Sequence, residues 1–100
     1  MGNRLALHQE LVRFAANVYY QPPATVRMKY PCIVYDLASI DSTYADNRTY
    51  LNTVKYSLTY ISEAPADDVV IDIFTAFRYI HFDRHYTADN LHHYVFTLYY

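Results

Sequence analysis

Glycine is almost absent from this chain, because Gly2 is the only one among its 100 residues. Glycine lets a backbone loop close tightly around a phosphate group, so the sequence argues against the glycine-rich loops of nucleotide-binding enzymes. Tyrosine, by contrast, occurs 13 times and phenylalanine 5 times. One modest core cannot bury so many tyrosines, and surface tyrosine is typical of protein interfaces. These features favour a protein that binds other proteins.

The overall composition predicts a single folded domain over residues 1–100. Hydrophobic residues make up 53% of the chain and charged residues 18%, which argues against disorder. The net charge of −2 argues against binding DNA through bulk charge. Apolar runs fall short of the roughly 20 residues of a membrane helix, and Met1–Glu10 lacks the apolar core of a signal peptide. We therefore expect no membrane association and synthesis in the cytoplasm.

Two segments have the apolar spacing of amphipathic helices, and they predict helices over about 3–16 and about 66–78. The apolar residues are Leu7, Leu11, Phe14, Ala15 and Val18 in the first, and Val70, Ile73, Phe74 and Phe77 in the second. Pro65 introduces the second helix, and Arg78 at its end suits the helix dipole.

Strand-like runs occupy most of the remaining chain. They are residues 18–20, 32–37, 54–61, 80–86 and 94–100, with a turn at 87–90. Phe82, Phe96 and Leu98 are expected core residues, and Ile80 and Tyr86 are expected to face the core beside Phe82. In the run 54–61, alternation places Val54, Tyr56, Leu58 and Tyr60 on one face. Hairpin-linked strands with helices to one side predict an α+β fold: an antiparallel sheet of about four to five strands with two helices packed on it.

Residues 38–51 differ from the strands on either side because they are polar and follow no period. They predict a long hairpin loop or arm, and loops of this length are usually functional or disordered. Contact with another protein and simple disorder are both compatible with the pattern. The candidate interface residues of this arm are Asp41, Tyr44, Asp46, Asn47, Arg48 and Tyr50.

His81, Asp83 and His85 alternate along a predicted strand, so they are expected to share one face. Imidazole and carboxylate groups suit several transition metals, which makes a metal site one interpretation. A polar interface face beside a buried one is the other interpretation. No further metal ligand is obvious, because the adjacent residues His92 and His93 would point to opposite faces.

Cys32 is the only cysteine, so it cannot form an internal disulfide or a cysteine-based zinc site. Its place in an apolar strand predicts a buried and inert thiol, although a Cys–His nucleophilic pair is the enzymatic alternative. Arg27, Lys29 and Tyr30 could form a short nucleic-acid strip, but two cations on an acidic protein favour a solvated strand face. We expect no catalytic residue, no metal and no cofactor.

Several stretches of this sequence resemble a family of small tail proteins of long-tailed bacteriophages, the tail terminators, which are also called tail completion or neck proteins. The resemblance covers nearly the whole chain in order. Its stretches are Val18–Pro23, Met28–Tyr35, Tyr44–Asn47, Phe82–Leu91 and Phe96–Tyr100. The block Phe82–Leu91, together with the Phe-Thr-Leu-Tyr-Tyr ending, is the most specific part.

The resemblance implies a structural virion protein, assembled in the host cytoplasm, that forms a hexameric ring at the head-proximal end of the tail tube. Such a ring stops tube polymerisation and gives the head connector a docking surface. Its implied partners are other copies of itself, the tail tube protein and the head-closure protein. Genome DNA would pass through the ring without specific binding. A head-closure adaptor or another neck protein (minor capsid protein) is the alternative, and a metal-dependent hydrolase or a monomeric binding module are competing classes.

Overall fold

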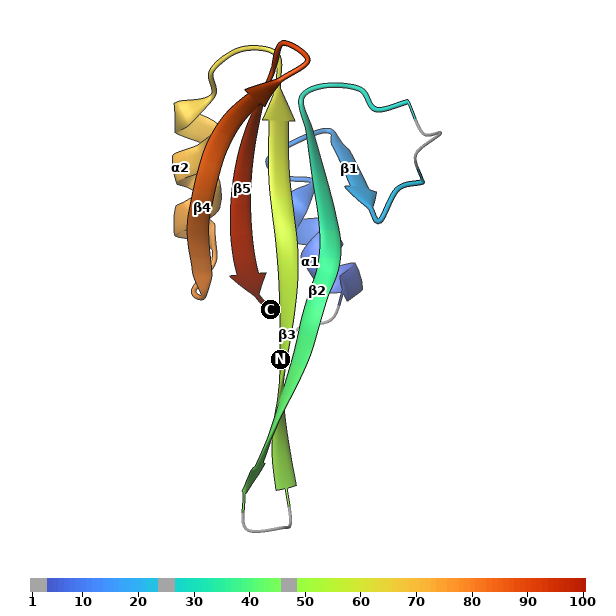
Figure 1. Ribbon diagram of the computed structural model, residues 1–100, viewed down its shortest axis with the longest axis vertical. Helices are drawn as coiled ribbons and strands as arrows, with labels where there is room; N and C mark the ends of the chain where they lie inside the picture. The colour runs from blue at the N-terminus through green and yellow to red at the C-terminus, as the bar shows by residue number, and fades with distance from the viewer. Residues whose placement is uncertain (1–3, 24–26, 46–48) are drawn as a thin grey trace.

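The computed structural model describes residues 4–23, 27–45 and 49–100, with side chains for all of these except 41–45 and 49–53. It has two helices and one five-stranded sheet (Figure 1), which confirms the predicted α+β fold. The elements are α1 Arg4–Leu11, β1 Asn17–Tyr20, β2 Cys32–Ala45, β3 Thr49–Ser62, α2 Asp67–Ala76, β4 Ile80–Ala88 and β5 Leu91–Tyr99. The strand order β1-β2-β3-β5-β4 places β1 and β4 at the two edges of the sheet.

The sheet is mixed, so the prediction of a purely antiparallel sheet was wrong at one strand. β1 pairs parallel to β2, from Asn17 opposite Cys32 to Tyr20 opposite Tyr35. The other three strand pairs are antiparallel. A parallel pair needs a crossover of about a dozen residues, and the connection between β1 and β2 is long enough to supply it.

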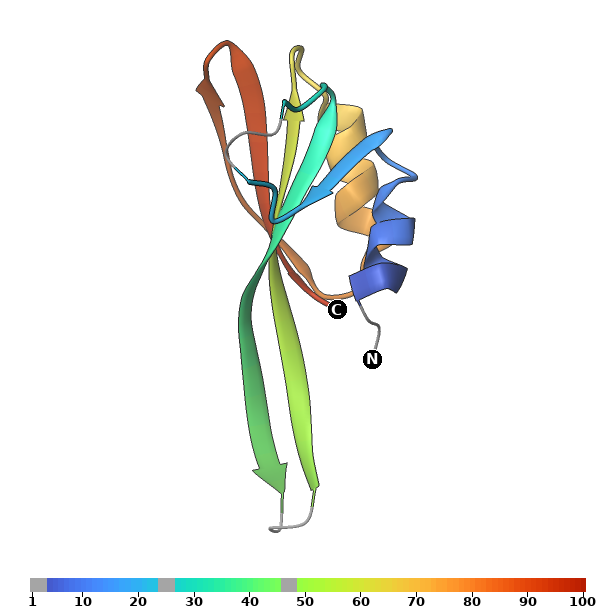
Figure 2. The same cartoon turned by 90° about the vertical axis from the view of Figure 1, so that its right-hand side faces the viewer.

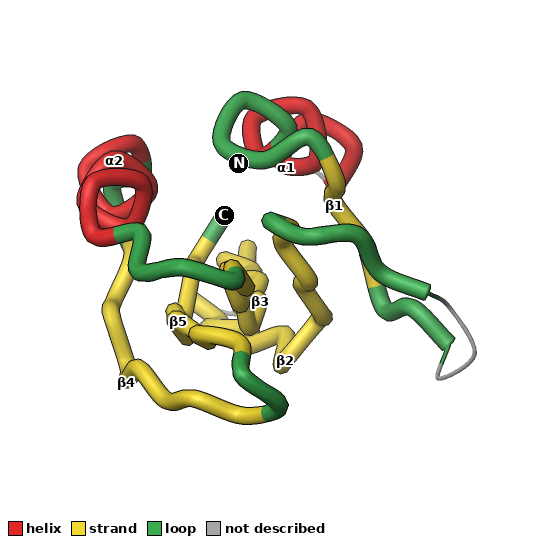
Figure 3. Tube along the Cα trace, turned by 90° about the horizontal axis from the view of Figure 1, so that it is seen from above, coloured by secondary structure: helices red, strands yellow, loops and turns green. Residues whose placement is uncertain are grey.

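Both helices cover the same face of the sheet, α1 on the side of β1 and α2 on the side of β4 (Figures 2 and 3). Alternate strand residues meet them in one core. Its fully buried members are Leu7, Leu11, Ile33, Tyr35, Leu58, Ile73, Phe96 and Leu98. The opposite face, called the outer face below, carries no helix.

Two tyrosines, the buried Tyr35 and the partly buried Tyr100, join α1 to the sheet through their hydroxyl groups. The Tyr35 hydroxyl lies 2.8 Å from Nδ1 of His8. At the end of the chain, the Tyr100 hydroxyl donates a hydrogen bond to the Glu10 carboxylate. That hydrogen bond, with burial, raises the pKa of Tyr100 to about 12. The hydroxyl therefore stays protonated, and keeps this link to α1, until the pH rises toward 12.

Both helices are shorter than the sequence predicted. α1 ends at Leu11, well before residue 16, and α2 ends at Ala76 because Phe77 adopts an extended conformation. Arg78 therefore lies beyond α2 and outside its last turn. The Tyr94 hydroxyl accepts a 3.2 Å hydrogen bond from the backbone N–H of Ala66, directly before α2 begins.

Phe82 was expected in the core, but 45% of it is exposed. It lies on the edge strand β4, where every residue after Ile80 is exposed. Its neighbour on the next strand, Phe96, is fully buried, and the two rings meet edge to face at 5.4 Å. The prediction was right for Phe96 and Leu98 and wrong for Phe82, because an open groove separates the edge strand β4 from α2 and leaves this ring partly in contact with solvent.

The difference between these two phenylalanines gives a stability test. Phe96→Ala should lower the free energy of unfolding by roughly 3–5 kcal/mol, because it leaves a cavity in the core. Phe82→Ala, the matched control, should cost only about 1 kcal/mol, since much of that ring already contacts solvent. Urea denaturation of both variants measures these values. Equal losses would contradict the assigned core.

Candidate interaction surfaces

A two-stranded ribbon extends from the body of the protein, and we call it the arm. It consists of residues 39–45 of β2 and 49–54 of β3, paired from Ser39 opposite Lys55 to Ala45 opposite Thr49. The partner strand β5 ends beside Lys55, and β1 ends beside Tyr35, so neither strand accompanies the arm. Figure 1 shows the arm projecting beyond the helices and the rest of the sheet. The molecule is consequently elongated, with principal extents of 51 × 29 × 22 Å.

The predicted arm is therefore confirmed as an arm, but it is made of strands where an irregular loop was the other expectation. A register shift between Leu37 and Ser39 marks its start, where the ribbon leaves the sheet. Such β-bulges bend a strand and increase its twist. Leu37 and Ile40, on either side of the shift, are 38% and 59% exposed. The base of the arm thus presents apolar side chains to solvent.

The arm holds three of its six candidate interface residues in described strands. Asp41 is paired with Thr53, and Tyr44 lies directly opposite Tyr50. The other candidates, Asp46, Asn47 and Arg48, lie outside the described residues.

The expected shared face of His81, Asp83 and His85 forms only in part, because His81 and Asp83 both lie at Thr97 on the outer face and His85 does not. A register shift between Phe82 and Arg84 interrupts β4, and the residues on its two sides pair out of phase. His81 lies opposite Thr97 on the outer face, whereas His85 lies opposite the buried residue Tyr94 on the helix-covered face. A strand bulge reverses the alternation of side chains, which a strict two-residue period cannot anticipate.

The same register shift turns Tyr86 away from the core, where the sequence had placed it. Tyr86 pairs with His93 on the outer face, and their rings stack at 4.6 Å. The Arg84 guanidinium lies 5.4 Å from the centre of the Tyr86 ring. Nearby, the Asp83 carboxylate accepts a 2.6 Å hydrogen bond from the Thr97 hydroxyl. The outer face therefore carries bonded polar and aromatic groups.

His85 instead meets His92, a pairing that the sequence reasoning missed. Nε2 of His85 lies 3.0 Å from Nδ1 of His92, and the His85 ring stacks on Tyr94 at 4.7 Å. Both histidines line a hollow of about 440 Å³ whose far side includes Asp67 and Ile71 of α2. The predicted turn at 87–90 could have revealed this pairing. A tight hairpin there places His92 opposite Thr87, and His85 lies two residues before Thr87 on the same face of β4.

Two imidazoles in hydrogen-bond contact could offer two nitrogen ligands to a metal. Within the part of the chain that the structure describes, no group of three or more His, Cys, Asp or Glu residues is placed to hold one.

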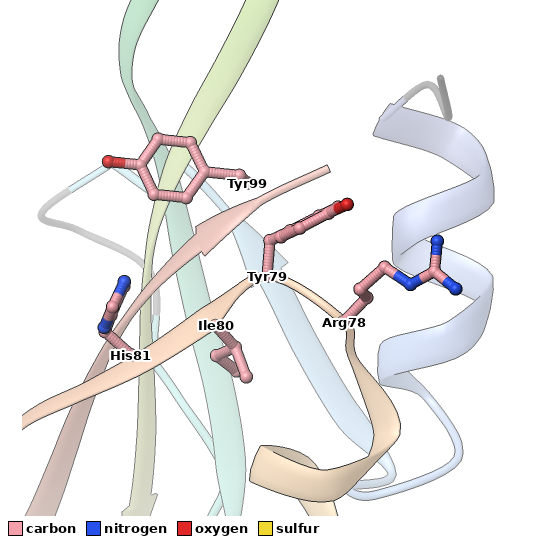
Figure 4. Close-up of a pocket in the computed structure, with 5 residues that line it drawn as sticks. All are labelled: Arg78, Tyr79, Ile80, His81 and Tyr99. Carbon is pink, nitrogen blue, oxygen red and sulfur yellow. The ribbon is translucent and has the colours of Figure 1, made fainter.

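A second hollow, of about 530 Å³, lies where β4 begins and β5 ends (Figure 4). Its lining consists of Arg78, Tyr79, Ile80, His81 and Tyr99. Tyr79, at 61% exposure, presents its ring to solvent. The lining offers a guanidinium, two phenol hydroxyls and an imidazole, all groups that hydrogen-bond and stack on a partner's surface.

An apolar groove lies between α2 and β4, and we call it the α2–β4 groove. It has a volume of about 270 Å³ and is lined by Val70, Ile71, Phe74 and Phe82. Ile71 is 59% exposed and Phe74 is 46% exposed. Large apolar side chains gathered in one exposed place mark an interaction site more often than single ones do.

Cys32 is fully buried, as predicted, and its burial raises the pKa of the thiol to about 11. A thiol with so high a pKa is a poor nucleophile at neutral pH, since the thiolate is the reactive form.

Arg27 and Lys29 lie in the connection before β2 and not on a strand face. The backbone N–H of Lys29 donates a 3.1 Å hydrogen bond to the Tyr19 hydroxyl.

No family model matches this chain, and no curated protein matches it. Among the described residues, the helices are too short and too polar to cross a membrane.

The buried thiol predicts slow alkylation. At pH 8, iodoacetamide should react with native Cys32 at least about a hundredfold more slowly than with the chain unfolded in guanidinium, because burial suppresses the thiolate. The native rate should rise as the pH approaches 11, where the thiol ionises. Mass spectrometry of quenched samples measures both rates. Similar rates at pH 8 would show that Cys32 is accessible.

The arm should be removable without unfolding the body. Ile40 and Val54 are paired, so an Asn-Gly turn can replace residues 41–53 and close a short hairpin. The shortened chain should keep its melting temperature within a few degrees, because the arm projects beyond the helices and the rest of the sheet (Figure 1). Calorimetry measures this. A large loss of stability would show that the arm supports the fold.

Proposed function

We propose that this chain is a structural ring subunit at the head-proximal end of a bacteriophage tail tube, where it ends tube growth and receives the head connector. The protruding arm is the observation that carries the proposal. A two-stranded ribbon is marginally stable alone in water, so contact with a neighbouring molecule would stabilise it. The resemblance of Phe82–Leu91 and Phe96–Tyr100 to tail terminators favours a ring on a tail tube as the assembly.

The sheet supports a repeating assembly because its two edges differ. β1 has four residues and β4 has nine, and neither has a partner on its outer side within the described sheet. A ring requires two different surfaces on each subunit, joined through a rotation that closes. The two different edges of this sheet would supply the two different surfaces that a ring subunit needs.

Termination by such a ring needs no chemical step. A tube of stacked rings always presents an unsatisfied surface at its growing end. A ring that matches this surface on one side, and differs on the other, blocks further addition by geometry. The proposal accordingly assigns no catalytic residue, metal or cofactor to this chain.

The proposed partners are further copies of the chain in a hexameric ring, the tail tube protein and the head-closure protein. The protein would reside in the virion, at the neck of the tail, after assembly in the host cytoplasm. Genome DNA would pass through the lumen without sequence-specific contacts. A head-closure adaptor is the neighbouring role in the same junction.

Tube length distinguishes these two roles. Particles that lack this protein should carry tubes of irregular and excessive length that fail to join heads, because the growing end is never capped. Purified protein added to polymerising tube subunits should halt elongation. Electron microscopy of the tubes measures both effects.

The variant with the shortened arm tests whether capping depends on the arm, since its body is expected to stay folded. It should assemble poorly and cap few tubes. Tubes of normal length in the absence of the protein, with only the head joint missing, would overturn the terminator role and favour the head-closure adaptor.

A further inference from the structure

The two flanks of the sheet differ in the sign of their charge. Residues 1–31, which include α1 and β1, contain four Lys or Arg residues and one acidic residue. Residues 63–77, which lead into α2 and include it, contain four acidic residues and no Lys or Arg; Arg78 follows directly and Arg84 lies on β4. α1 and α2 lie on opposite sides of the molecule (Figure 3). The subunit is therefore basic on one flank and acidic on the other.

The acidic flank surrounds the α2–β4 groove. Asp67, Asp68 and Asp72 are exposed on α2 and lie within a turn of Ile71. Asp67 also lines the adjoining hollow beside Ile71 and Phe82. An apolar centre with a charged rim is the usual composition of a protein interface.

The basic flank has a matching apolar centre at α1. Leu5 on α1 and Val12, directly after its last residue Leu11, are 64% and 46% exposed. The backbone N–H of Val12 donates a hydrogen bond to the carbonyl oxygen of His8, so the seven-residue spacing keeps both side chains along one side of the helix axis. Arg13 follows Val12 directly and is exposed, as are Arg27 and Lys29. The one acid of this flank, Glu10, accepts the hydrogen bond from Tyr100, which holds it toward the sheet.

We infer that the α2–β4 groove of one copy receives α1 of the next copy. Leu5 and Val12 would cover Ile71 and Phe74. Arg13, which follows Val12 in the chain, would approach the acidic rim of α2, and Arg27 and Lys29, in the connection between β1 and β2, would add positive charge to the same flank. This inference rests on the proposed ring and names its lateral contact.

The charge distribution identifies a second copy of this chain as the occupant. Two acidic flanks, or two basic flanks, would repel each other, which disfavours a symmetric dimer through either surface. An acidic flank against a basic flank attracts, and every subunit carries one of each. The contact is therefore head-to-tail, the type that closes into rings.

Charge reversal tests the contact with two variants of the intact chain. Asp68→Lys/Asp72→Lys reverses the groove rim, and Arg13→Glu/Arg27→Glu/Lys29→Glu reverses the α1 flank. All five residues are exposed, so both variants should fold. Each variant alone should associate roughly a hundredfold more weakly than the wild type, because each junction then brings like charges together. An equal mixture should regain assembly, because alternating copies restore opposite charges at every junction.

Analytical ultracentrifugation over a wide concentration range, at low and high salt, measures the association. The matched control for the groove-rim variant is Asp36→Lys/Asp89→Lys, which changes the net charge by the same amount outside both flanks and should associate as the wild type does. Either flank variant assembling like the wild type, or a mixture that stays dissociated, would overturn the inferred contact.

Tube capping separates failure of this contact from failure of the ring role. Flank variants that still assemble and still cap tubes would overturn the contact and leave the ring role intact. A wild-type chain that stays monomeric at every concentration, and leaves tube elongation unchanged, would overturn the ring role and with it the contact.

Discussion

One-sided burial of the sheet is the constraint from which the other features follow. Both helices pack on the same face, and the core lies between them and alternate residues of β2, β3 and β5. The outer face, the edge strand β4 and the arm are left without a covering layer. Antiparallel sheets tolerate one solvated face, but they then rely on polar groups and local irregularities to stay soluble and unpaired. The surfaces available for assembly are the parts that this core does not reach.

Two β-bulges interrupt the regular two-residue period of the sheet. The first, between Leu37 and Ser39, lies where β2 leaves the body and the arm begins. The second, between Phe82 and Arg84, lies on the edge strand and exchanges the two faces of β4. The second bulge brings His85 against Tyr94 and turns Tyr86 outward, so the outward-facing chemistry of β4 depends on one extra residue.

The sequence predicted which side chains face the core wherever a strand keeps its regular two-residue period. Alternation in β3 correctly gave Tyr56, Leu58 and Tyr60 a common buried face. The same period predicted the wrong face for His85 and Tyr86, because the bulge between Phe82 and Arg84 cannot be recognised from the residue types alone. It also failed over residues 38–51, where a ribbon without a covering layer needs no apolar alternation and its strands look like a polar loop. The parallel pairing of β1 was missed for a different reason: four residues contain too little pattern to give a direction.

The lateral and axial surfaces of the subunit are physically independent, and a tube terminator requires this independence. The charged flanks lie across the sheet, beside its edges β1 and β4, whereas the arm extends along the long axis of the molecule (Figure 1). A lateral contact through α1 and the α2–β4 groove would therefore leave the arm free to meet a ring above or below. The charged side chains of the two flanks are exposed and the arm projects from the body (Figure 1), so substitutions at either surface should leave the other unchanged. One small domain can then close a ring through its flanks and recognise a different neighbour through its arm.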